Sequence, residues 1–265
     1  MTDLSNENVI HVKKDGGSYL KFRRLERYPE IRHMFTLKPY DFATYAAYEE
    51  KREAANAAEE FVKNELGIEA LCRSKQTHSD HTVVVGMADR GIFPPQLNDI
   101  DGLITNERGL GLLQTFADCT PLLFYDPEKH VVANTHSGWK GTLKRIGFKT
   151  VTQLKEHFGC APENVICCIG PHIRSCSFEV DKDVSDLFAE EFSDLKERVI
   201  RFDPDKYKYF IDTAEINRQM LLKAGLKDEN IIDSGICTVC ESDICQSYRA
   251  DRALSGRAAA LIALI

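Results

Sequence analysis

Three short stretches of the chain carry side chains that bind borderline metal ions, each beside an apolar segment. They contain His78, Cys119 and His136. Catalytic zinc sites are built from three such protein ligands, with a fourth position left for water or substrate. One thiolate and two imidazoles suit Zn²⁺ and poorly suit Mg²⁺ or Ca²⁺. The residue types indicate a zinc site, but their spacing matches no short zinc motif, and buried thiols and core histidines remain the commoner explanation.

The elements that must position these residues are read from apolar periodicity. Short β-branched runs alternate irregularly with amphipathic segments, which favours mixed sheets covered by helices over a regular parallel βαβ series. No linker or repeat marks a boundary, so we expect one domain over residues 1–265. The expected strands are 82–87, 102–105, 111–117, 121–125, 131–135, 165–169, 177–180, 231–236 and 258–264, and the expected helices are 45–66, 142–158, 184–192 and 213–224.

Composition excludes several classes of protein. A net charge of −7 argues against a nucleic-acid binder, whose affinity rests on neutralising phosphates. The first residues lack the pattern of a signal peptide and no apolar run is long enough to span a membrane, so we expect a cytoplasmic protein. Disulfides rarely persist there, and the nine cysteines therefore need another explanation. No glycine-rich loop for a dinucleotide or a nucleotide phosphate is present.

A second group of cysteines, Cys237, Cys240 and Cys245, contains a Cys-x-x-Cys pair. Such a pair occurs in zinc knuckles and in redox proteins. No second Cys-x-x-Cys and no histidine lies nearby in the sequence. We therefore expect these cysteines to be buried or incidentally reactive, without an assigned role.

Several motifs occur together, in order, from about Lys75 to the C-terminus. They are Gln76-Thr77-His78, Asp101-Gly102-Leu103-Ile104-Thr105, Ala117-Asp118-Cys119-Thr120-Pro121, His136-Ser137-Gly138-Trp139-Lys140-Gly141, Ile169-Gly170-Pro171-His172-Ile173, Cys176-Ser177-Phe178-Glu179-Val180, and Ser247-Tyr248-Arg249 followed by Gly256-Arg257. In this combination the chain resembles the purine nucleoside phosphorylase family formerly named multicopper polyphenol oxidases or laccase-domain proteins. The resemblance implies that His78, Cys119 and His136 bind zinc at the active site.

The resemblance also implies a fold and an activity. The fold would be of the α+β type, a layered αββα-like sandwich similar to the cysteine-hydrolase-like fold of bacterial deamidase toxins. The reactions would be phosphorolysis of adenosine, inosine, guanosine and methylthioadenosine to base and pentose 1-phosphate, and deamination of adenosine. The partners would then be a small nucleoside and phosphate, with no nucleic acid or membrane, and the protein would be a monomer or a small homo-oligomer.

Catalytic roles are expected for Cys119 and its neighbour Asp118. Deamination needs a carboxylate to carry protons to and from a zinc-activated water, and Asp118 is the nearest in sequence. Asp118 could equally orient His78 or His136. Successive strand residues face opposite ways, so Asp118 reaches the site only if the strand ends or bulges there.

Substrate-binding residues are expected around the same motifs. Trp139 could stack on a purine ring or pack over its loop, and Gln76 belongs to the first ligand motif. Possible phosphate donors are Lys140, Arg249 and Arg257. One departure from the family lies near the N-terminus, in the stretch Phe35-Thr36-Leu37-Lys38-Pro39-Tyr40-Asp41, which lacks the arginine and the two glycines of the family's loop and has Lys38 in the place of the arginine. Lysine is a point charge rather than a bidentate fork, so we expect altered specificity or weaker phosphorolysis.

Two other functions compete with this interpretation. Cys119 could be a nucleophile with His136 as its base, as in a cysteine hydrolase or deamidase; a metal-bound thiolate is a poor nucleophile, so one state of the site cannot do both. A copper-dependent polyphenol oxidase would need many histidines, largely in His-x-His pairs. The chain has eight histidines and no such pair, which argues against a trinuclear copper cluster.

Overall fold

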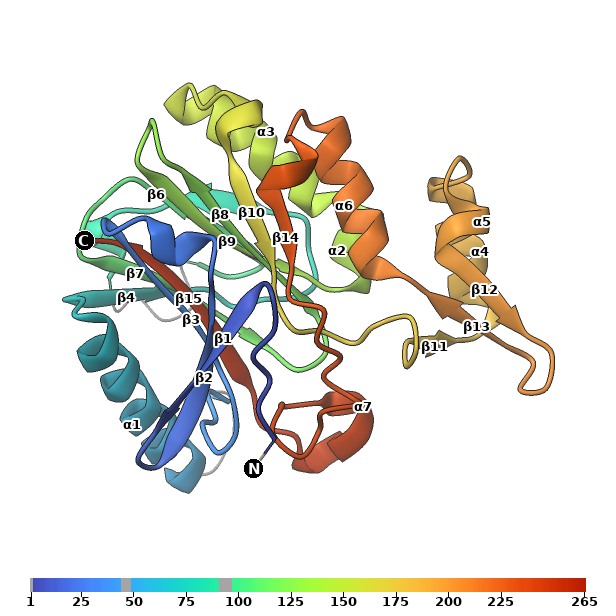
Figure 1. The fold of residues 1–265 in the computed structure, drawn as a ribbon, viewed down its shortest axis with the longest axis horizontal. Coiled ribbons are helices and arrows are strands. Elements are labelled where there is room, and N and C mark those ends of the chain that lie inside the picture. Colours follow the sequence, from blue (N-terminus) through green and yellow to red (C-terminus); the bar gives the residue numbers. More distant parts are fainter. Residues whose placement is uncertain (1, 44–48, 91–96) are drawn as a thin grey trace.

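The computed structural model describes residues 2–43, 49–90 and 97–265, which form two six-stranded sheets, a small third sheet and several helices (Figure 1). In spatial order the first sheet contains β1 (Val9–Lys14), β2 (Gly17–Phe22), β3 (Ile31–Thr36), β15 (Ala258–Leu264), β7 (Leu110–Phe116) and β4 (Ala70–Arg73). The second contains β14 (Ile231–Asp233), β10 (Ile166–Ile169), β8 (Thr120–Asp126), β9 (Val131–Ser137), β6 (Gly102–Thr105) and β5 (Thr82–Val84). Both sheets are mixed, since β4–β7, β10–β14 and β5–β6 are parallel pairs and the others are antiparallel.

The two sheets pack face to face, and helices cover their outer faces. Alternate residues of one strand belong to different clusters, as the two-residue period of a strand requires. In β7, Leu112 faces the second sheet and Leu113 faces α1 (Glu49–Leu66). In β10, Cys168 lies between the sheets, whereas Cys167 packs with α3 (Ile146–Phe158) and α6 (Thr213–Lys223). The layers are therefore helix, sheet, sheet, helix, and the central strands are apolar on both faces.

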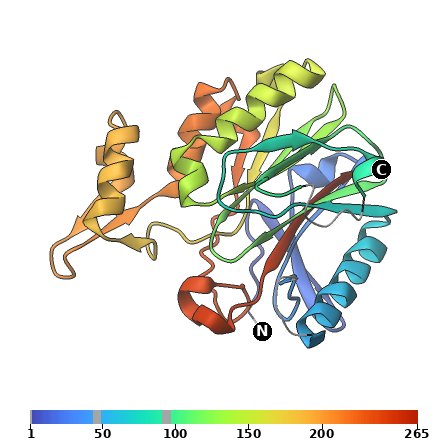
Figure 2. The same ribbon diagram turned by 180° about the vertical axis from the view of Figure 1, so that it is seen from behind.

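A small lobe stands apart from these layers, on the side away from α1 in both Figure 1 and Figure 2. It is built from β11 (Glu179–Val180), α4 (Lys182–Glu191), α5 (Lys196–Val199), β12 (Ile200–Asp203) and β13 (Lys208–Ile211). Its apolar residues, including Phe188 and Phe192, share a cluster with Ile216 and Met220 of α6 and with Trp139. The lobe is thus packed on the helix layer next to α2 (Trp139–Leu143).

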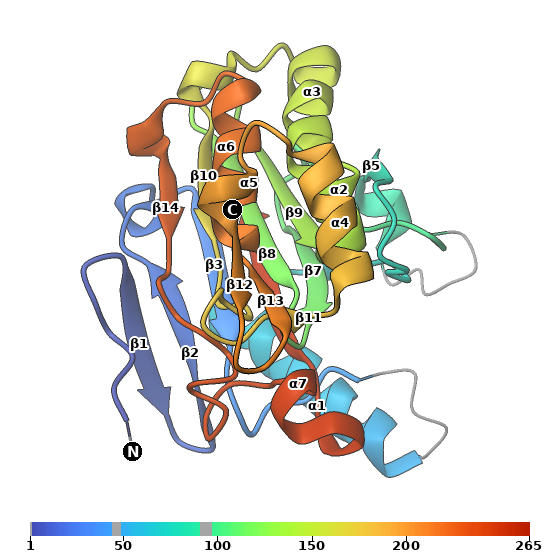
Figure 3. The same cartoon turned by 90° about the vertical axis from the view of Figure 1, so that its right-hand side faces the viewer.

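The remaining helix, α7 (Tyr248–Asp251), lies at the end of the molecule opposite α3 and α6 (Figure 3). Ser247 caps it by accepting a hydrogen bond from the backbone N–H of Ala250. No helix of the described ranges is long and apolar enough to cross a membrane.

Most expected elements are present, with shifted ends, and the α+β class is confirmed. The helix expected at 142–158 is in fact two helices, because Arg145 adopts a left-handed backbone conformation (φ 60°) that ends α2 and begins α3. The segment expected as a strand at 177–180 pairs only over β11. The N-terminal strands β1–β3 and the β12–β13 hairpin were not expected, since their lysines, arginines and tyrosines mask the period of two. Part of the helix expected at 45–66 lies outside the described residues.

Candidate metal centre and adjoining cavity

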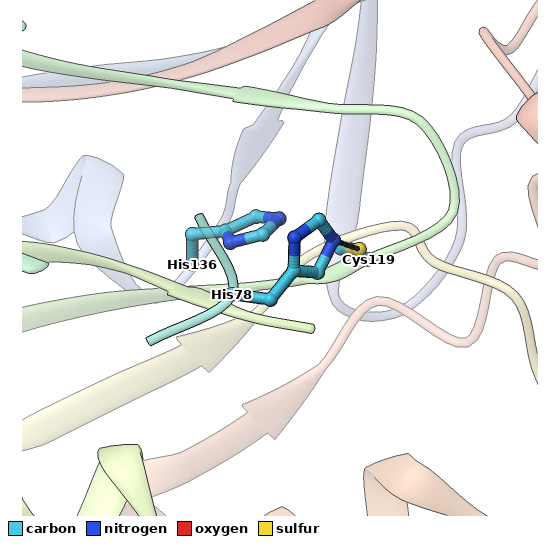
Figure 4. A group of neighbouring side chains, drawn as sticks. All are labelled: His78, Cys119 and His136. Carbon is cyan, nitrogen blue, oxygen red and sulfur yellow. Dashed lines mark hydrogen bonds between the residues drawn. The ribbon is translucent and has the colours of Figure 1, made fainter. Parts of the chain in front are cut away.

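Three segments that are distant in the sequence bring His78, Cys119 and His136 together (Figure 4). His78 lies in the loop between β4 and β5, Cys119 in the turn directly before β8, and His136 in β9. Their candidate ligand atoms all lie within 4.8 Å of one another. The His78 Nε2 and Cys119 Sγ atoms are 3.5 Å apart, and the two imidazole centroids are 5.0 Å apart. We call these three residues the mixed cluster.

The buried carboxylate of Asp101 supports two of the three ligands. Asp101 Oδ1 lies 2.7 Å from Nδ1 of His136 and accepts the backbone N–H of His78 at 3.1 Å. Its other oxygen accepts the backbone N–H of Thr77 and both the N–H and hydroxyl of Ser79. Asp101 therefore shapes the loop that carries His78 and engages one nitrogen of His136, leaving Nε2 of that ring for the cluster.

Gly138 makes room for the cluster. A Cβ atom at this position would lie 2.5 Å from Cδ2 of His78 and 3.2 Å from Sγ of Cys119. Contacts below 3.0 Å require one of the groups to move. Any other residue at 138 would therefore displace the His78 ring, so this glycine permits the close approach of the ligands.

The charges of the cluster reinforce one another. Burial by itself would raise the pKa of the Cys119 thiol, but the His136 charge and hydrogen bonds from both histidines outweigh it and lower the pKa to about 6. Burial would likewise lower the pKa of His136, but the Cys119 thiolate and Asp101 raise it to about 9. Burial opposes ionisation of Asp101 as well, yet its bonds to His136 and Ser79 hold the pKa near 2. The opposite pKa shifts of Cys119 and His136 favour a thiolate beside an imidazolium when no metal is bound.

The mixed cluster forms part of the wall of a cavity of about 500 Å³. This volume is within the usual range for small-molecule sites. The aromatic side chains Trp139, Phe178 and Tyr248 line it together with Ile173 and two arginines, Arg249 and Arg257. An apolar and aromatic wall with a few cationic groups fits a flat heterocycle that carries a polar or anionic part.

Four of the expected substrate-binding residues line this cavity. Gln76 is held by Thr115, which donates its backbone N–H and hydroxyl to the side-chain oxygen. Trp139 begins α2, lines the cavity and also packs with the apolar cluster of the lobe. The Arg249 guanidinium donates to the carbonyls of Ser177 and Glu179.

Arg257, the fourth, donates from Nη1 to the carbonyls of residues 255 and 256. The two expected lysines are placed differently, as neither belongs to the described residues that line the cavity. Lys38 Nζ pairs with Asp251 at 2.8 Å and donates to the carbonyl of Ser242 at 2.7 Å. Lys140 Nζ lies 5.4 Å from the centroid of the Trp139 ring.

Asp118 lines the cavity because β7 ends at Phe116 and β8 begins at Thr120, which places it in the turn with a φ of 82°. Its Oδ1 accepts the Thr238 hydroxyl at 2.6 Å and its Oδ2 accepts the backbone N–H of Arg249, also at 2.6 Å. The expected alternative, in which Asp118 orients His136, is therefore replaced, because the carboxylate that hydrogen-bonds His136 is that of Asp101.

Asp101, Phe178 and Tyr248 were not singled out as site residues. All three stand in the motifs that carry the family resemblance, which was the available signal. Residue type and hydrophobic periodicity alone gave no signal for these three residues, since an Asp before a strand and aromatic residues in loops are common.

The comparisons with known proteins agree on one family. The family model described as "Multi-copper polyphenol oxidoreductase laccase" matches residues 36–265. Purine nucleoside phosphorylase YlmD of Bacillus subtilis is 37% identical over 193 residues, 71% of this chain and 69% of that protein. A purine nucleoside phosphorylase of Bacteroides thetaiotaomicron is 30% identical over 263 residues, 94% of this chain and 97% of its own length.

A further relative, adenosine deaminase RL5 from an unknown prokaryotic organism, is 31% identical over 67% of this chain and 69% of its own length. Among solved structures, the Bacillus licheniformis hypothetical protein YfiH superimposes with a TM-score of 0.86 at 27% identity, covering 96% of this chain and 99% of that one. The chain therefore belongs to the multi-copper polyphenol oxidoreductase laccase family, whose relatives here are named purine nucleoside phosphorylases and an adenosine deaminase.

Proposed function

We propose that this protein is a zinc-dependent purine nucleoside phosphorylase with adenosine deaminase activity. Its substrates would be adenosine, inosine, guanosine or methylthioadenosine with phosphate, and its products the base and a pentose 1-phosphate. The observation that carries the proposal is the mixed cluster in the wall of a cavity that also presents aromatic rings and two arginines. The names of the relatives support the same reaction class.

The donor set fits zinc. One thiolate and two imidazoles converge within 4.8 Å, and the carboxylate of Asp101 engages His136 from behind, as outer partners of zinc ligands do. The cavity adjoins the cluster and leaves space for a fourth ligand. When bound, zinc would supply a Lewis acid for a water molecule or a substrate oxygen.

The residues around the cluster would bind and orient the substrate. Trp139, Phe178 and Tyr248 offer ring faces and edges to a purine. Arg257 is the stronger candidate for phosphate, because only Nη1 of its guanidinium is used by the described residues. Arg249 already donates from two nitrogens to carbonyls, so we assign it to the shape of the wall as well as to charge.

Asp118 would carry protons in the deamination. Its carboxylate lines the cavity and each oxygen accepts one hydrogen bond, which leaves further lone pairs for a substrate or water. The two hydrogen bonds also fix its orientation, as a general base requires.

We assign the chain to one cytoplasmic domain of residues 1–265, acting on small molecules as a monomer or a small homo-oligomer.

The decisive experiment measures products from adenosine with and without phosphate, using zinc-loaded and chelator-treated protein. Phosphorolysis should yield adenine and ribose 1-phosphate only when phosphate is present. Deamination should yield inosine in either case, since water is then the nucleophile. Chelation should abolish both reactions and zinc should restore them. The same assay is run with inosine, guanosine and methylthioadenosine. The proposal would be refuted if zinc-loaded protein converted none of the four nucleosides.

A cysteine hydrolase or deamidase is the second candidate. The arrangement Cys119, His136 and Asp101, with the pKa of the thiol lowered to about 6, resembles a nucleophile–base–carboxylate series. This reaction would survive chelation, so amide hydrolysis by metal-free protein would favour it. The described residues form two groups of potential metal ligands with three members each, which is too few for a trinuclear copper cluster, and we do not propose an oxidase.

A further inference from the structure

A second set of thiols converges next to the small lobe. The Sγ atoms of Cys176, Cys237 and Cys240 all lie within 4.8 Å of one another. Three free cysteines in such proximity form a soft ligand set that suits zinc. We propose that this group, the thiol cluster, binds a second zinc ion.

Two distant segments build the thiol cluster. Cys176 lies in the loop between β10 and β11, and the other two thiols lie in the segment between β14 and α7. A bridge between His172 and Cys237, with the N–H of Thr238 donating to the His172 carbonyl at 3.0 Å, fastens one segment to the other. The third ligand that the Cys-x-x-Cys pair lacks in the sequence is thus supplied by the fold.

The distances fit a tetrahedral zinc site. Zinc–sulfur bonds of about 2.3 Å in a tetrahedron place neighbouring sulfurs about 3.8 Å apart. The Cys176 and Cys240 sulfurs are 3.7 Å apart. The Ser177 hydroxyl oxygen lies 3.5 Å, 3.6 Å and 3.7 Å from the sulfurs of Cys176, Cys237 and Cys240. This oxygen is nearly equidistant from the three sulfurs, so it, or a water molecule in its place, is available as the fourth ligand.

The location of the thiols separates them from the other described cysteines. Cys176 and Cys240 are exposed and Cys237 is buried beside them, whereas Cys72, Cys160, Cys167, Cys168 and Cys245 are all buried. Burial in an apolar core explains those five, but it does not explain thiols that gather at the surface. An ion can reach the cluster from solvent, and binding would release the thiol protons.

Residues next to the thiol cluster are hydrogen-bonded to residues that line the cavity beside the mixed cluster. The Ser177 carbonyl accepts a hydrogen bond from the Arg249 guanidinium, and the Thr238 hydroxyl donates to Asp118. An ion at the thiol cluster would fasten both segments and so hold this part of the cavity wall in place. The proposal does not depend on the reaction that the cavity catalyses.

The test is a titration of reduced, metal-stripped full-length protein with Co²⁺, followed by displacement with Zn²⁺. The Cys119→Ala variant isolates the thiol cluster by disabling the mixed one. We expect two ions per chain in the wild type and one in Cys119→Ala, with an absorption band from thiolate-to-cobalt charge transfer. Adding Cys176→Ser and Cys240→Ser to Cys119→Ala should remove the remaining ion.

One control variant and one alternative variant make the result specific. Cys245→Ala removes a cysteine of the same segment whose thiol lies outside the cluster, and it should leave the stoichiometry unchanged. If Cys119→Ala fails to fold, Cys240→Ser alone should lower the stoichiometry of the wild type from two ions to one. No cobalt band in fully reduced Cys119→Ala, an unchanged band after both serine substitutions, or a Cys176–Cys240 disulfide that forms despite added zinc would overturn the proposal.

Discussion

The mixed cluster and the thiol cluster hold similar numbers of ligands in very different settings. The mixed cluster is carried by the β4–β5 loop, the turn before β8, and β9, with a fully buried carboxylate behind it and a cavity beside it. The thiol cluster sits in two loops, with two of its three cysteines exposed and the Ser177 hydroxyl nearly equidistant from the three sulfurs. Zinc sites that catalyse keep an open position, while structural sites are closed by protein ligands. We therefore propose a catalytic role for the mixed cluster and a structural role, holding the two loops together, for the thiol cluster.

The largest expected effect comes from Cys119→Ala. Loss of the thiolate should abolish the proposed zinc binding by the mixed cluster and lower kcat by about 10³-fold or more, because a bound Lewis acid supplies several kcal/mol of transition-state stabilisation. Metal analysis, circular dichroism and nucleoside turnover measure the outcome. Cys240→Ser should leave turnover far less affected, and equal losses in the two variants would break the distinction between the clusters.

Asp101→Asn tests the buried support of the mixed cluster. The amide keeps the shape of the carboxylate but removes the charge that orients His136 and holds the loop of His78, so zinc affinity should fall about 10–100-fold. Competition with a chromogenic chelator measures this affinity. The matched control is Asp99→Asn, a half-exposed neighbour whose left-handed backbone (φ 60°) tolerates asparagine. A similar loss of affinity in the control would contradict the role of Asp101.

Arg257→Gln tests whether Arg257, in the wall of the cavity beside the mixed cluster, binds phosphate. Hydrogen bonds to charged groups contribute about 1.5–3 kcal/mol, so the KM for phosphate should rise roughly 10–100-fold. Deamination of adenosine should change much less, because it uses no phosphate. Lys140→Gln is the control, as that lysine lies outside the cavity lining. If both reactions slowed equally, Arg257 would shape the cavity rather than bind the anion.

The pH dependence of alkylation compares the thiols of the two clusters. In metal-free protein the lowered pKa of Cys119 predicts a thiolate fraction that rises about tenfold between pH 5 and 7 and then levels off. For Cys240, the Ser177 hydroxyl lowers the pKa, but burial and hydrogen bonds with Cys176 and Cys237 raise it, whereas the pKa of its partner Cys237 is lowered. The reactivity of Cys240 should therefore still increase at a pH where that of Cys119 has levelled off. Mass mapping of iodoacetamide adducts separates the sites. Parallel profiles would show that the two environments do not differ.

Lys38→Arg should have the smallest effect. The lysine is paired with Asp251 and Ser242 away from the cavity lining, so an arginine there is expected to leave both the phosphate-dependent and the deamination rates nearly unchanged. Steady-state rates with and without phosphate provide the check. A selective rise in phosphorolysis would restore the interpretation of Lys38 as a substitute for a phosphate-binding arginine.

Local pattern predicted the core elements well and the periphery poorly. The strands around β8, β10 and β15 and the start of β9 were found because burial on both faces makes them largely apolar runs. The N-terminal strands β1 and β2 and the hairpin of the lobe mix lysines or an arginine with their apolar residues, so their period of two is weak in the sequence. A single left-handed residue, Arg145, divided one expected helix, and backbone conformation at a non-glycine residue leaves no mark in the sequence.

By itself, the sequence determined the donor types of the mixed cluster, the apolar strands beside them and the family motifs. It left the partners of these donors undetermined, because hydrogen bonds such as those of Asp101 join residues 22 to 35 positions apart. Only the tertiary structure placed Asp118 with Thr238, Lys38 with Asp251, and Cys176 with the Cys-x-x-Cys pair. The physical reason is that side-chain chemistry belongs to a single residue, whereas convergence on one point depends on how the sheets and loops pack.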